Sequence, residues 1–238
     1  MEEPYSTEIV ESLTELHDLL LSEETLQSTL DRVVALARAG CDSAGVTIVD
    51  DLHASSAAAT DDFTLKIDVD QYDNREGPCL QAVISEEVVM IEDIATETRW
   101  PSFTQTAARD GLGATLSLPL TAGGKTIGAL NLYAKTPRAF GDGDRALGML
   151  MAGQAAVAIS NARVYESALK LAEQLTEAIK TREIIGEAKG ILMAQEGVSE
   201  DEAFDMLTRL SQNTNIKLRD IAQKIVDEAV KKNRAQGT

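Results

Sequence analysis

A single lysine, Lys189, lies between two small residues in a largely apolar helical segment near the C-terminal end of the sequence. Its neighbours Ala188 and Gly190 leave the helix surface bare on both sides of the charge. Two interpretations are open. In the first, the small residues let helices pack closely, and the lysine stem packs while its ammonium group reaches water. In the second, a nucleotide approaches the backbone there and Lys189 binds its phosphate.

Other cations of the C-terminal segment extend this candidate phosphate-binding surface. Arg182 precedes Lys189 on the same predicted helix. Lys217 and Arg219 lie at the start of the last predicted helix, where positive charge opposes the helix dipole, so a phosphate contact is the more natural role. Arg209 lies near the end of the helix before it, where a cation complements the dipole, and both interpretations stay open.

The net charge of −17 is spread unevenly along the 238 residues. Residues 1–180 hold 13 Lys and Arg against 29 Asp and Glu, whereas residues 181–238 hold 9 against 10. A polyanion is repelled by strongly acidic protein surface, so the C-terminal segment is the part where one could dock.

Composition also restricts the location and the chemistry. The sequence has no uninterrupted apolar run of about 18 residues, so we expect no membrane span. The acidic N-terminus lacks a basic signal region, and we expect a cytoplasmic protein. Two cysteines, Cys41 and Cys79, and two histidines form no metal-ligand spacing, so no metal and no cofactor is evident. The sequence shows no nucleophile elbow, phosphate loop or paired catalytic carboxylates, and we expect no enzyme.

Periodicity predicts helices, then strands, then helices. A helix over Thr7–Leu21 and another reaching Gly40 come first. Short helices are predicted after Gly77-Pro78 and over Arg99–Gly111. The predicted strands alternate apolar and polar residues and cover Gly45–Asp50, Thr64–Asp70, Val88–Asp93, Ala114–Leu120 and Lys125–Ala134.

A long helix is predicted from Asp142 to Met193, with Gly197 after its end. Apolar residues recur along it at spacings of four and three, which is typical of a coiled-coil seam. The seam favours a pair of helices from two chains, although an intramolecular bundle gives the same pattern. Its positions are Val164, Ala168, Leu171, Leu175, Ala178, Arg182, Ile185, Lys189 and Leu192.

Two shorter helices complete the C-terminal segment. Ser199 and Glu202 have the spacing of a capping box, which predicts a helix over Glu200–Leu210. A polar turn, Ser211–Asn215, then precedes a helix over Leu218–Val230. Phe204 is the only aromatic residue in 181–238, and its spacing is that of a core residue, so the guanidinium plane of Arg209 is the first candidate for base stacking.

The segment Glu187–Ala222 closely resembles the ANTAR domain. The resemblance is carried by the AKGILM block, by the spacing of Glu202, Ala203, Phe204, Leu207 and Arg209, and by the KLRDIA block at Lys217–Ala222. It implies the RNA-binding output module of transcription antitermination regulators. Such modules bind paired stem-loops, usually as a dimer, and prevent a terminator hairpin from forming.

The preceding part resembles a GAF sensor domain. The blocks that match are GPCLQAV (Gly77–Val83), RWPSF (Arg99–Phe103), SLPL (Ser117–Leu120) and IGALNLYA (Ile127–Ala134). Such a domain can bind a small molecule, and the sequence does not identify one. Cys79, Trp100 and Phe103 are candidates for a sensor pocket, although a buried filler role for the thiol and a core role for the two rings are the plainer interpretations.

Together these observations predict an α+β protein with an antiparallel-sheet sensor joined by a long coiled-coil helix to a three-helix module. The expected divisions are an N-terminal helix (1–21), a GAF domain (22–163), a linker (164–180) and an ANTAR domain (181–238). We expect a homodimer that binds tandem stem-loops in RNA, and neither DNA nor a membrane. The rival hypothesis is a small-molecule sensor whose tail serves only dimerisation or protein contacts. The expected RNA-binding residues are Arg182, Ala188, Lys189, Gly190, Arg209, Lys217 and Arg219.

Overall fold

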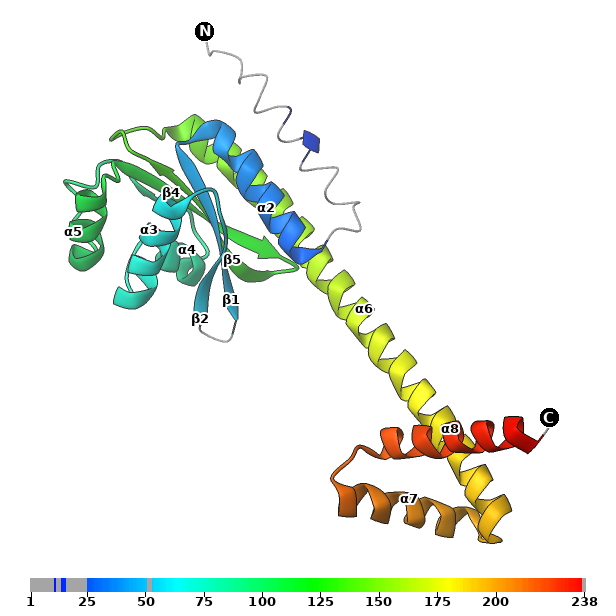
Figure 1. Ribbon diagram of the computed structural model, residues 1–238. Helices are drawn as coiled ribbons and strands as arrows, with labels where there is room; N and C mark the ends of the chain where they lie inside the picture. Colours follow the sequence, from blue (N-terminus) through cyan, green and yellow to red (C-terminus); the bar gives the residue numbers. More distant parts are fainter. Residues whose placement is uncertain (1–10, 12–13, 16–24, 51–52, 237–238) are drawn as a thin grey trace. The chain divides into compact units, whose positions relative to one another are not determined.

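A computed structural model describes residues 11, 14–15, 25–50 and 53–236 (Figure 1). The chain divides into two compact units, residues 1–167 and 168–238, which are described separately. The division falls inside the segment predicted as a coiled-coil linker. Most of the helix predicted over Thr7–Leu21 lies outside the described residues.

The first unit is built on a five-stranded antiparallel sheet with the order β2-β1-β5-β4-β3. The hairpin between β4 and β5 turns at Gly123 and Gly124, which both have positive φ, as glycine permits. The sheet and the helices around it confirm the predicted α+β class. The strands are β1 (Ser43–Asp50), β2 (His53–Ala59), β3 (Val89–Ile91), β4 (Ala114–Ala122) and β5 (Lys125–Ala134).

Two helices cover one face of the sheet, α2 (Leu26–Ala37) and the first part of α6 (Asp142–Glu196), and they run side by side in Figure 1. Their apolar side chains share one core with the leucines of β4 and β5. The other face carries α3 (Asp62–Asn74), α4 (Pro78–Ser85) and α5 (Pro101–Asp110). A second core lies there, around Ile67, Phe103 and Tyr133.

Two sequence predictions in this unit are wrong. Thr64–Asp70, predicted as a strand, lies within α3, which buries polar Asp68 and Gln71 and exposes Leu65 and Val69. Its apolar alternation therefore does not mark the buried face. Residues 53–59, predicted as a turn, form β2, whose small side chains give almost no periodic signal.

The second unit contains the end of α6 together with α7 (Glu200–Thr214) and α8 (Leu218–Gln236). Gly197 has a φ of 69° and follows the last residue of α6, as predicted. The predicted capping box is present, because Ser199 accepts from the Glu202 amide while Glu202 accepts from Ser199. However, α7 extends through Thr214, so most of the segment predicted as a polar turn is helical.

Candidate functional site

Lys189 lies on α6 opposite the first turn of α7. Its Nζ is 2.5 Å from Oε1 of Glu200, and its side chain is 21% exposed. The Lys189 ammonium holds the pKa of Glu200 below its usual range. The lysine is therefore paired with a carboxylate whose own side chain is 68% exposed, so the ion pair is open to solvent on the Glu200 side.

The two small neighbours of Lys189 have different surroundings. Ala188 is fully buried and packs in a core with Leu207, Ile221 and Ala222. This burial supports the helix-packing interpretation for Ala188, while its place at the RNA-binding surface stays a prediction. Gly190 is exposed, and a Cβ built on it would meet nothing within 4 Å.

A groove runs along α6 beside Lys189. Arg182 and Lys189 line it from α6, and Glu200 and Phe204 line it from α7. Two of the predicted cations therefore line one groove, together with the carboxylates of Glu177 and Glu200. Phe204 was predicted to be a core residue, and this is wrong, because the side chain is 43% exposed while Ala203 and Leu207 fill the core.

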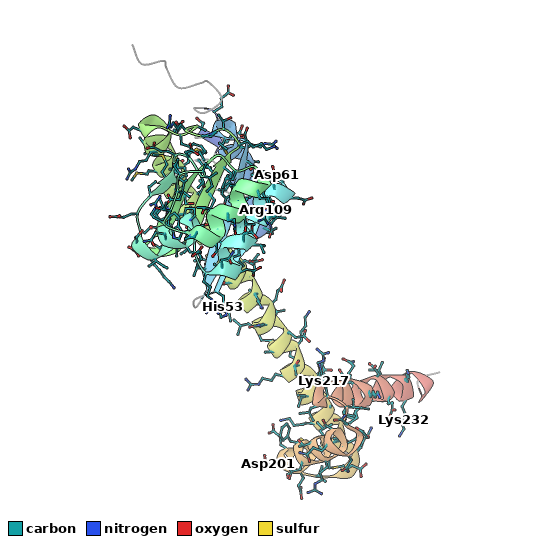
Figure 2. All side chains as sticks on the ribbon, turned by 90° about the vertical axis from the view of Figure 1, so that its left-hand side faces the viewer. His53, Asp61, Arg109, Asp201, Lys217 and Lys232 are labelled. Carbon is teal, nitrogen blue, oxygen red and sulfur yellow. The ribbon has the colours of Figure 1, made fainter. Side chains whose placement is uncertain are left out.

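The remaining predicted cations lie outside this groove. Arg209 and Lys217 are exposed and form no ion pair with a described residue. Lys217 directly precedes α8, and Figure 2 labels it where that helix begins. Arg219 pairs with Glu177, itself a lining residue, and its Nε is 3.3 Å from Asp220. Arg219 is therefore at the edge of the groove.

The predicted heptad seam divides into two parts. Val164, Leu171 and Leu175 are each more than half exposed. By contrast, Ile185 and Leu192 are partly buried against the small core formed with α7 and α8. The C-terminal part of the seam is therefore used within the chain, whereas its earlier part presents an apolar stripe to solvent.

A buried polar network lies between the sheet and α3 in the first unit. Asp68 is fully buried and accepts hydrogen bonds from Tyr133, from Asn131 Nδ2 at 3.3 Å and from Ser56 Oγ at 3.1 Å. Burial raises the pKa of Asp68 to about 6. Sequence reasoning missed this network, because Asp68 lies in the segment that was predicted as a strand and is helical in the structure.

The three predicted pocket residues lie in the interior of this unit. Cys79 is fully buried, and its Sγ donates to Thr47 Oγ1 at 3.1 Å. Burial raises the pKa of the Cys79 thiol to about 12, so the reactive thiolate is not formed near neutral pH. Phe103 is fully buried, and Trp100, 8% exposed, carries the Arg99 guanidinium 4.4 Å from its ring centroid. In this conformation, the Cys79 and Phe103 side chains are closed to a ligand.

Two features are absent from the part of the chain that the structure describes. No cluster of three or more His, Cys, Asp or Glu side chains could hold a metal ion there. Within the same residues, no helix combines the length and apolarity needed to cross a membrane.

Each of the two units contains a match to a known protein family. Residues 22–160 match the GAF domain family, and the chain belongs to that family. Residues 173–226 match the ANTAR domain, which makes the chain a GAF protein with a C-terminal ANTAR domain. This architecture indicates a signalling protein that binds RNA and regulates antitermination. No curated protein matched the sequence.

Solved structures support the fold of the first unit. The GAF domain of an Acinetobacter phosphoenolpyruvate-protein phosphotransferase superposes with a TM-score of 0.52 at 16% identity, covering 67% of this chain and 96% of that one. The chromophore-binding domain of the R. palustris bacteriophytochrome RpBphP3 superposes with a TM-score of 0.52 at 18% sequence identity. The match covers 70% of this chain and 65% of that one. A free methionine-R-sulfoxide reductase from Neisseria meningitidis superposes with a TM-score of 0.50 at 15% sequence identity. The match covers 68% of this chain and 95% of that one. At these identities the likeness shows the fold alone.

Proposed function

We propose that this chain is a homodimeric, cytoplasmic antitermination regulator that binds paired stem-loops in nascent transcripts. The ANTAR unit grips the two hairpins and keeps a competing terminator hairpin from forming. The GAF unit responds to a small molecule and sets whether the dimer is competent to bind. The protein itself carries out no catalysis.

The observation that carries the proposal is the groove where Arg182 and Lys189 lie together on a nearly neutral unit. Exposed Gly190, next to Lys189, leaves space for a phosphate backbone to approach. Arg209 and Lys217 add cations that no described carboxylate neutralises. Backbone phosphates supply most of the affinity of such contacts, and that affinity depends on salt.

The exposed stripe on α6 supports the dimer. Val164, Leu171 and Leu175 follow the four-and-three spacing of a coiled-coil seam. The spacing of seven continues upstream through Val157 and Leu150, which are also exposed. A second copy of α6 would bury these exposed side chains.

The test is a gel shift with a two-hairpin RNA at several salt concentrations. We expect Lys189→Ala, Arg209→Ala and Lys217→Ala each to weaken binding and to lower the salt slope by about one. Lys66→Ala is the control, because Lys66 is an exposed lysine of the GAF unit that pairs with Asp110. Wild-type protein that binds no tandem stem-loop, at any salt concentration, would contradict the proposal.

The alternative function, a sensor whose tail serves only dimerisation or protein contacts, has support of its own. The stripe through Leu171 and Leu175 needs a second helix and does not need RNA. The same gel shift separates the two functions, because the alternative gives a stable dimer with no salt-dependent RNA binding.

A further inference from the structure

Phe204 is exposed to solvent and does not fill the core of its unit. On α7 the core positions are taken by Ala203 and Leu207, which are fully buried, while the ring of Phe204 is 43% exposed in the groove. Single exposed apolar residues are common on protein surfaces, but an aromatic ring that lines a groove beside cations offers a face on which a base can stack. The ring thus calls for a partner with an apolar or aromatic face.

Charge around the ring indicates what kind of partner this is. Glu200 lies four residues, about one helical turn, before Phe204 on the same side of α7, about 6 Å away along the axis. It holds Lys189, and Arg182 lies on the same wall of the groove as Lys189. An exposed ion pair of this kind contributes little, so a phosphate can take the place of the Glu200 carboxylate.

We propose that the groove binds one unpaired nucleotide of the RNA loop, with its base stacked on Phe204. The phosphate of that nucleotide displaces Glu200 and binds Lys189 and Arg182. This inference rests on the proposed RNA-binding function and assigns it a subsite. Proteins recognise RNA loops by stacking splayed-out bases on aromatic side chains, and the Phe204 ring lines the same groove as two cations of α6, which are two helical turns apart.

The discriminating variant is Phe204→Leu, which keeps an apolar side chain and removes the aromatic face. We expect it to bind a two-hairpin RNA about tenfold more weakly, as is typical for the loss of one stacked base, with an unchanged salt slope. Phe204→Trp should retain the affinity, and its added tryptophan fluorescence should be quenched when RNA binds. Leu210→Ala is the matched control, because Leu210 is a similarly exposed apolar residue of α7 outside the groove.

A second variant tests the carboxylate. Glu200→Gln removes the competitor of the phosphate, so we expect tighter RNA binding than wild type at low salt. Lys189→Ala combined with Glu200→Gln should lose this gain, because the phosphate then lacks its partner. Equal RNA affinities of wild type and Glu200→Gln would contradict the displacement step.

Two outcomes would overturn the inference, and a third would overturn its premise. Wild-type affinity in Phe204→Leu at all salt concentrations would show that no base stacks on the ring, while RNA binding itself stands. Weaker dimerisation of Phe204→Leu by light scattering, with RNA affinity per dimer unchanged, would show that a second chain covers the groove. Wild-type protein that fails to bind RNA would remove the proposed function itself.

Discussion

The ionisation of the buried Asp68 carboxyl opposes folding of the first unit. Its ordinary pKa of 3.8 rises to about 6 because the folded chain buries it among Tyr133, Asn131 and Ser56. Near pH 7 the carboxylate is ionised in both states, and the folded state bears the desolvation cost. As the pH falls through about 6 towards 3.8, the folded state takes up a proton first, so this site stabilises the fold increasingly.

We therefore predict that acidification will affect wild type and Asp68→Asn differently. Between about pH 7 and pH 4, the free energy of unfolding of wild type should rise relative to that of the variant. The shift of about two pKa units corresponds to roughly 3 kcal/mol. Urea denaturation of both proteins at several pH values measures the difference, and parallel stability curves would exclude this role for Asp68.

At the scale of elements, the packing of α6 against α7 and α8 depends on Ala188. Its side chain is fully buried beside Leu207 and Ala222, so a larger residue has no room. We predict that Ala188→Leu destabilises this unit by about 1–3 kcal/mol. Hydrogen exchange in the full chain should then show lost protection in α7 and α8, with the GAF unit unchanged.

Gly190 provides the matched comparison two residues later. A Cβ there meets nothing within 4 Å, and the position is helical. Gly190→Ala should therefore stabilise α6 by up to about 1 kcal/mol through helix propensity. If both variants were destabilised equally in hydrogen exchange, space at the two positions would not explain the difference in their roles.

The elements differ in how far sequence predicted them. The β4–β5 hairpin, the proline-started α4 and the capped α7 have local signals, so their positions followed from turn and cap residues. α3 was missed because its inward face is polar and depends on partners distant in sequence, such as Tyr133. In the candidate site, Lys189 and Arg182 were identified from charge and spacing. The exposure of Phe204 was not, because a ring at helical spacing has the pattern of core.

At the scale of the whole molecule, the proposed dimer depends on the exposed apolar stripe of α6. We predict that replacing Leu171 and Leu175 together by Glu converts a dimer into a monomer, because paired helices would place the carboxylates in an apolar seam. Light scattering measures the mass directly. Leu169→Glu is the control, because Leu169 is exposed on the same helix but lies off the seam. A double variant that stays dimeric would place the dimer contact elsewhere.

The connection between α6 and α7 consists of three residues, Gly197, Val198 and Ser199. Gly197 adopts the left-handed conformation and Ser199 is fixed by its reciprocal bonds with Glu202, so this corner has little freedom. The two helices that it joins line the groove from opposite sides, with Lys189 on α6 and Phe204 on α7. The RNA loop proposed to bind here would therefore enter a groove that is already formed, and little conformational entropy of the protein chain would be lost.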